Sequence, residues 1–100
     1  VGRRSSLFQM FGQQNAPRAP AINLTLYSRP DCHLCEKMKA TLARVARRYP
    51  FELTEIDVST NSELEKAYGS EIPVLMIEGQ KTAHYYIREE ELLQKLAGYY

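Results

Sequence analysis

The sequence predicts a single α/β domain in which a mixed sheet of four strands carries helices on both faces. Three observations lead to this fold class: apolar and polar residues alternate over 22–27, apolar residues recur at helical spacing over 32–48, and an uninterrupted apolar run covers 74–77. The predicted order is strand, helix, strand, helix, strand, strand, helix. A βαβ unit with a right-handed crossover is therefore followed by a hairpin and a terminal helix.

Length and composition are those of one globular domain. The chain has 100 residues, of which 44% are hydrophobic, so a modest core is possible. No apolar run approaches the ~20 residues of a membrane-spanning helix, and the N-terminus lacks the apolar centre of a secretory signal, so we expect a cytoplasmic protein.

The charge is unevenly distributed along the chain. Residues 1–50 hold nine Lys/Arg and two acids, whereas residues 51–100 hold four and ten, which predicts that one end of the molecule is basic. The basic residues form no clustered tract and are not interleaved with an aromatic platform. We therefore do not expect nucleic acid as a partner.

The first 21 residues predict a disordered arm that precedes a domain at 22–100. They contain Gln, Asn, Pro and Arg, no acid, and no sustained period. Arginines and serines near the start, with Leu7, Phe8 and Phe11, are also typical of an organelle transit peptide. Targeting of the protein to an organelle by this arm is therefore an alternative to a disordered terminus without a function.

The first strand and the first helix meet at a short break. The strand has Ile22, Leu24 and Leu26 on one face, and Pro30 ends it because proline has no N–H donor. We expect Asp31 to be the N-cap of the helix. The inward-facing stripe of that helix would consist of Leu34, Met38, Leu42 and Val45.

The next two elements are a strand at 51–58 and a short helix at 59–68. The apolar pattern of the strand slips in phase near Glu55, which predicts a bulge or burial on both faces. The run Thr60-Asn61-Ser62-Glu63 fits a capping box, and Gly69 fits a C-terminal stop. We expect this helix to be half exposed.

The C-terminal part predicts a hairpin and a last helix. Strands at 74–77 and 81–87 would be joined by a turn at 78–80. The helix at 89–97 has an acidic first turn and Gly98 at its end. Its inward-facing residues would be Leu92, Leu93 and Leu96.

The two cysteines of the chain predict a redox-active dithiol. Cys32 and Cys35 lie three residues apart at the start of the first helix, where unpaired backbone N–H groups and the helix dipole stabilise an anion. Cys32 would therefore attack a substrate disulfide as a thiolate, and Cys35, one turn further in, would be an enclosed resolving thiol. Arg29, His33 and Lys37 would add positive field and favour the thiolate.

Other interpretations of this motif remain open. Buried cysteine is often only a small hydrophobe, and two cysteines are too few for the disulfide framework of a secreted domain. A lone C-x-x-C supplies at most half of a tetrahedral metal site, with His33 and His84 the only nitrogen candidates. We expect no metal and no tightly bound cofactor; a zinc ion or iron–sulfur cluster bridged between chains is a minor alternative.

With these residues identified, the chain resembles the thioredoxin superfamily and, within it, a glutaredoxin-like family. The resemblance covers 22 to about 97 and rests on three blocks in order, LTLYSRPDCHLC at 24–35, IDV at 56–58 and EIPVL at 71–75. It implies that Cys32 is the nucleophile and Cys35 the resolving thiol. It also implies a sheet ordered second, first, third, fourth, and a cis peptide at Ile72–Pro73 that faces the dithiol and contacts the backbone of a substrate or of glutathione.

The chain departs from a standard dithiol glutaredoxin around the dithiol. Cys-His-Leu-Cys replaces Cys-Pro-Tyr-Cys, Glu71 replaces the threonine of Thr-Val-Pro, and His84-Tyr85-Tyr86 replaces the Gly-Gly turn that precedes the glutathione-binding Asp. We therefore leave glutathione binding open. The expected function is a monomeric thiol–disulfide oxidoreductase that acts on a protein disulfide or a glutathione mixed disulfide, with glutathione as a candidate reductant. The alternative is a non-catalytic binding module that uses the groove at Pro73.

Overall fold

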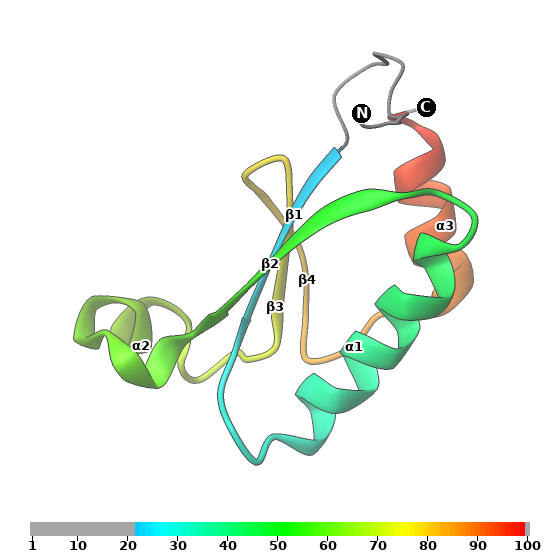
Figure 1. The fold of residues 1–100 in the computed structure, drawn as a ribbon. Coiled ribbons are helices and arrows are strands. Elements are labelled where there is room, and N and C mark those ends of the chain that lie inside the picture. Colours follow the sequence, from blue (N-terminus) through cyan, green and yellow to red (C-terminus); the bar gives the residue numbers. More distant parts are fainter. Residues whose placement is uncertain (1–21, 100) are drawn as a thin grey trace, which may run out of the picture.

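The computed structural model describes residues 22–99 and contains one four-stranded sheet in the order β2-β1-β3-β4 (Figure 1). The strands are β1 (Ile22–Ser28), β2 (Phe51–Asp57), β3 (Val74–Ile77) and β4 (Gln80–His84). β1 pairs in parallel with β2 and antiparallel with β3, which pairs antiparallel with β4. The predicted fold class and strand order are confirmed, whereas the predicted disordered arm lies outside the described residues.

β1 is a central strand of the sheet and leads from the core to residues 29–32, here called the dithiol loop. Its alternation holds, since Leu24 is 1% and Leu26 0% exposed while the intervening side chains face the other side of the sheet. The strand runs one residue further than predicted, to the buried Ser28. It therefore ends directly before the turn that leads into the cysteines.

The first helix, α1 (His33–Ala46), begins later than the predicted N-cap implies. The N-cap is Cys32, not Asp31. Asp31 has φ 57, in the left-handed region, and occupies the turn that re-aims the chain before the helix. The predicted cap is therefore wrong by one residue, because the sulfur of Cys32 takes the place of a capping oxygen.

The buried stripe of α1 is displaced by one residue at its start. Leu34 is 41% exposed, whereas Cys35 is 1% exposed and continues the stripe that faces the sheet. The members of this stripe are Cys35, Met38, Thr41, Leu42 and Val45. Spacings of three and four residues place Cys35 above Met38, and Leu34 lies about 100° away around the helix axis.

β2 is an edge strand, and the features predicted near Glu55 are absent from it. Its register with β1 is unbroken from Phe51 to Asp57, so the predicted bulge is wrong. Burial on both faces is wrong too, since an edge strand leaves Glu52 and Glu55 exposed. The bulge of this sheet lies between β3 and β4, at Leu75/Met76.

A 3-10 turn, η2 (Val58–Thr60), leads from β2 into α2 (Ser62–Tyr68). Asn61 caps α2 by accepting the N–H groups of Glu63 at 2.8 Å and of the following residue at 3.1 Å. The predicted cap at Thr60 is thus wrong by one residue, while Gly69 ends the helix as predicted. None of the α2 residues is buried.

The hairpin and the last helix, α3 (Glu89–Ala97), close the fold. Glu78 and Gly79 form a two-residue turn with φ 50 and 79, the geometry of a type I′ hairpin. β4 ends at His84 rather than at 87 because Tyr85 adopts φ 65 and turns the chain. α3 has the predicted bounds and stop, and Leu92 and Leu96 are fully buried.

The helices cover the two faces of the sheet unequally. α1 and α3 pack against each other over one face, and the main core lies between them and the sheet. On the other face, α2 reaches the end of the sheet, where the Tyr68 ring stacks on Tyr27 with centroids 4.2 Å apart. The core residues are Ile22, Leu24, Leu26, Met38, Leu42, Val45, Leu75, Ile77, Ile87, Leu92 and Leu96.

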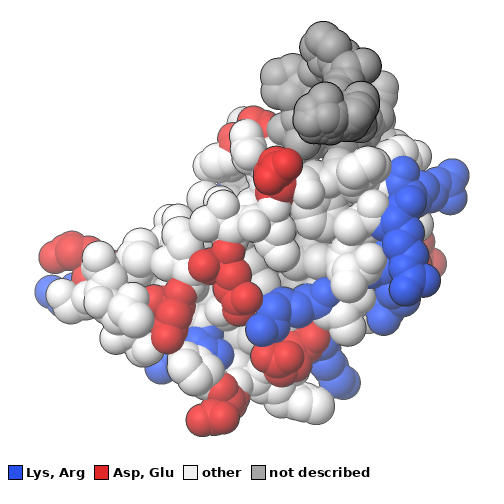
Figure 2. All heavy atoms as spheres, viewed as in Figure 1, with Lys and Arg blue, Asp and Glu red and all other residues white. Residues whose placement is uncertain are grey.

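The charge asymmetry of the sequence is visible on the surface. Figure 2 shows acidic side chains over β2 and basic side chains over the C-terminal part of α1. In the span from 22 to 99, no helix combines the length and the apolar character that crossing a bilayer requires.

Candidate active site

Cys32 is at the N-terminus of α1, where its sulfur acts as the cap. Its backbone is extended, with φ −109 and ψ 108, and its Sγ accepts the N–H of Cys35 at 3.1 Å. The carbonyl of Cys32 accepts the N–H of Glu36 at 3.1 Å and starts the helical ladder. The sulfur is thus held at the end of the helix where partial positive charge favours an anion.

The two cysteines form a disulfide and differ in access to solvent. Their Cα atoms are 5.2 Å apart, and Cys35 is 1% exposed whereas Cys32 is half-buried. A partner sulfur can therefore approach Cys32 but not Cys35. The difference matches the predicted division into an attacking and an enclosed thiol, although the roles themselves stay predictions.

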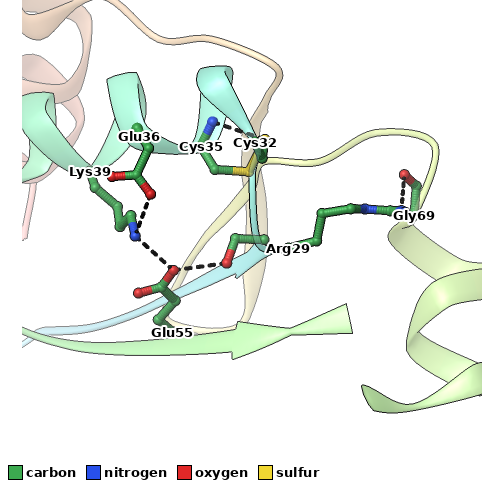
Figure 3. Close-up of a disulfide and its surroundings, with 8 residues drawn as sticks. Arg29, Cys32, Cys35, Glu36, Lys39, Glu55 and Gly69 are labelled. Carbon is green, nitrogen blue, oxygen red and sulfur yellow. Dashed lines mark hydrogen bonds and ion pairs between the residues drawn. A yellow bond between two sulfur atoms is a disulfide. The ribbon is translucent and has the colours of Figure 1, made fainter. Parts of the chain in front are cut away.

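The three basic residues predicted to favour the thiolate are not all directed toward the dithiol. His33 and Lys37 are exposed on the first turns of α1. Arg29 points away from the disulfide, as Figure 3 shows, and its Nη2 donates to Glu65 Oε2 at 2.7 Å and to the carbonyl of Gly69 at 2.9 Å. Arg29 therefore links the dithiol loop to the end of α2, and its effect on the thiolate stays a prediction.

A charged network adjoins the dithiol on the side of β2. Ser28 Oγ donates to Glu55 Oε2 at 2.9 Å, and Lys39 Nζ contacts Glu36 at 2.9 Å and Glu55 at 3.2 Å (Figure 3). Hydrogen bonds from Lys39 to Glu36 and then to Glu55 raise the pKa of the lysine. The network was not predicted. Its one trace in the sequence is that Glu55 stands where the alternation begun by Phe51 and Leu53 would place an apolar residue, and the unbroken register with β1 puts this carboxylate on the α1 side of the sheet.

Residues 69–73, here called the 69–73 loop, lead into β3. Val74 pairs with Tyr27, so this loop and the dithiol loop leave the sheet at the same end. The Ile72–Pro73 peptide is cis, the isomer that the resemblance implies, and Pro73 is buried. Among the described residues, no hydrogen bond engages the backbone N–H or C=O of Ile72.

His84, the second nitrogen candidate for a metal, is the last residue of β4, whereas His33 is the first residue of α1. Its ring packs edge-on against Tyr85, with centroids 4.7 Å apart. Within residues 22–99, no group of three or more His, Cys, Asp or Glu side chains is arranged to hold a metal ion. The site is therefore a dithiol beside an ion-pair network, and the unpaired backbone of Ile72 lies at the same end of the sheet.

This strand order, with a C-x-x-C pair at the start of the first helix, defines a thioredoxin-fold protein. The profile of the glutaredoxin-like domain (DUF836) matches residues 23–97, and the chain belongs to this family. No curated protein matches the chain.

Solved structures agree with this assignment. The solution structure of protein Ne2328 from Nitrosomonas europaea is 30% identical with a TM-score of 0.69, and the alignment covers 82% of this chain and 99% of that chain. The X-ray structure of a structural-genomics target protein from X. campestris is 29% identical with a TM-score of 0.66, covering 75% and 96%. A thioredoxin mutant from Halobacterium salinarum, 21% identical with a TM-score of 0.60 over 80% and 75%, shares the fold.

Proposed function

We propose that this chain is a thiol–disulfide oxidoreductase in which Cys32 is the nucleophile and Cys35 the resolving thiol. The observation that carries the proposal is the Cys32 sulfur at the cap of α1, where it accepts the Cys35 N–H at 3.1 Å. In the reduced protein, the same N–H and the helix dipole stabilise a thiolate over a thiol. The pKa of Cys32 should therefore lie below the ordinary value of about 8.5.

The proposed reduction of a substrate proceeds in two exchanges. The Cys32 thiolate attacks one sulfur of the substrate disulfide, forms a mixed disulfide, and releases the other substrate sulfur as a thiolate that takes a proton. Cys35 then loses its proton and attacks the Cys32 sulfur, which releases the second substrate sulfur as a thiol. The substrate gains two electrons and two protons, and the dithiol becomes a disulfide.

The substrates we propose are a protein that carries a disulfide, or a glutathione mixed disulfide. A thiol reductant must then restore the dithiol, and glutathione is the candidate for this step. All the groups that the two exchanges require belong to one chain, which is consistent with action as a monomer. His33 and Lys37 are the exposed basic residues nearest to Cys32 along the helix, and we propose that they favour approach of an anionic substrate or reductant.

The test is an equilibrium titration of the chain in buffers of reduced and oxidised glutathione, with mass spectrometry of acid-quenched samples. We expect a reversible change of two mass units, because one intramolecular disulfide opens and closes, at a potential between about −270 and −120 mV. Absence of a reversible intramolecular disulfide would refute the proposed activity.

Single cysteine variants assign the two roles. Cys35→Ser should accumulate a mixed disulfide on Cys32, because no second thiol is present to resolve it. Cys32→Ser is the matched control and should form no adduct under the same conditions, since Cys35 is 1% exposed. Equal labelling of both variants would contradict the assignment.

The second candidate is a non-catalytic binding module, and the unpaired backbone of Ile72 favours it. An extended partner segment can add to such groups as a strand without any exchange of sulfur. In cells, a Cys32→Ser chain that retains function while substitutions at Ile72 abolish it would select this candidate. Loss of function in Cys32→Ser selects the oxidoreductase instead.

A further inference from the structure

The 69–73 loop is held in place by residues that lie outside it. Arg29 binds the carbonyl of Gly69 at 2.9 Å, and Lys81 forms an ion pair with Glu71. Tyr85 contacts the loop at two further points. The loop that carries the open Ile72 backbone is thus fixed to the dithiol loop on one side and to the end of β4 on the other.

Tyr85 bridges the length of this loop. Its backbone N–H donates to the carbonyl of Pro73 at 2.9 Å, and its phenol Oη donates to the carbonyl of Ser70 at 2.8 Å. The two acceptors lie on either side of Ile72 in the chain. One residue therefore contacts both the beginning and the end of the segment that presents the Ile72 backbone.

The conformation of Tyr85 is costly for a bulky side chain. Its φ of 65 lies in the left-handed region, where glycine is the residue without a steric penalty. Such a conformation persists only where the surroundings determine it, and here the two hydrogen bonds and the edge-on contact with His84 do so. The ring and its hydroxyl thus perform a task in this position that glycine could not.

We infer that Tyr85 is a positioning residue for substrate: it holds the 69–73 loop so that the Ile72 backbone pairs with an extended polypeptide whose disulfide lies at Cys32. This inference rests on the proposed function and adds a distinction between substrates. A peptide disulfide uses the Ile72 backbone groups and depends on Tyr85. A small disulfide without a peptide backbone reaches Cys32 alone and does not.

The test compares Tyr85→Phe with the unaltered chain on two substrates, a disulfide-bonded peptide and hydroxyethyl disulfide. Loss of the hydrogen bond to Ser70 should raise the KM for the peptide by about two- to fivefold and leave kcat unchanged, because one partly exposed hydrogen bond is removed. Turnover of the small disulfide should stay the same. Tyr86→Phe is the matched control: Tyr86 is 61% exposed, its phenol makes no hydrogen bond with a residue between 22 and 99, and both substrates should be unaffected.

A second variant, Tyr85→Gly, tests whether misfolding accounts for the change in KM. Glycine removes the ring but accepts φ 65 without a penalty, so the thermal midpoint should stay close to that of the unaltered chain while the KM for the peptide rises at least as much as in Tyr85→Phe. An equal loss on both substrates, or no change on either, overturns the inference. If the unaltered chain reduces neither substrate, the proposed function has failed instead, and the two failures are thereby distinguished.

Discussion

Replacing Arg29 with methionine separates two roles for this side chain, a link between loops and an electrostatic effect on the Cys32 thiol. Its guanidinium is 2.7 Å from Glu65 and 2.9 Å from the carbonyl of Gly69. Arg29 Nε is buried and has no hydrogen-bond partner among the described residues. Methionine keeps the apolar stem and removes the charge, both hydrogen bonds and the unsatisfied donor.

The expected loss of stability follows from these contacts. The hydrogen bond to the Gly69 carbonyl contributes about 1–1.5 kcal/mol, below the usual range for a charged donor because the Arg29 side chain is 35% exposed. The ion pair with Glu65, whose side chain is 42% exposed, adds no more than about 0.5 kcal/mol after screening by solvent. Removal of the unsatisfied Nε offsets part of this, so the free energy of unfolding should fall by about 1–1.5 kcal/mol.

Urea unfolding of the reduced protein measures this loss. With an m-value of about 1 kcal/mol per molar, the midpoint should fall by about 1–1.5 M. The pKa of Cys32, followed by thiolate absorbance, should change little, in contrast to the positive field that the sequence predicts from Arg29, because the guanidinium is directed at Glu65 and Gly69. Arg47→Met makes the same change of charge at an exposed residue and should shift the midpoint by less than about 0.5 M. An unchanged midpoint together with a raised pKa of Cys32 would refute this reasoning and assign Arg29 to the thiolate.

Two further predictions concern the 69–73 loop. Gly69→Ala should lower the free energy of unfolding, measured in urea, by about 1–3 kcal/mol, because a Cβ there would overlap the carboxylate and the carbonyl of Glu65. In the control variant Gly98→Ala the new Cβ makes only ordinary contacts, so the change should be neutral or slightly stabilising. Equal effects of the two substitutions would contradict the steric argument. The ion pair with Lys81 lowers the pKa of Glu71 below its ordinary value of 4.5, so its contribution to stability is present above that pH and is lost on acidification through the lowered pKa. Glu71→Gln should therefore flatten the acid limb of the urea midpoint plotted against pH, and an unchanged limb would show that the pair does not stabilise the fold.

Most of the secondary structure was predictable because it depends on neighbours in sequence. The alternation in β1 and the leucines of α3 record which side of each element faces the core, and both elements have close to their predicted bounds. The predictions that were wrong concern the N-caps of α1 and α2 and the edge strand β2. The local pattern at Asp31 and at Thr60 allows two adjacent caps, and the choice depends on how the preceding turn directs the chain. At Glu55, the pattern cannot tell an edge strand from a central one.

The sequence by itself determined the central feature of the site, two thiols at the start of a helix that follows a strand, because all of that information lies within the consecutive residues 22–48. Only the tertiary structure decided what surrounds them. Glu55 meets Lys39, Arg29 meets Gly69, and Tyr85 meets Ser70 across separations of 15 to 40 residues. Charge and hydrogen-bonding capacity identify such residues as able to form contacts, but their partners follow from strand order and from the geometry of turns, which no local pattern specifies.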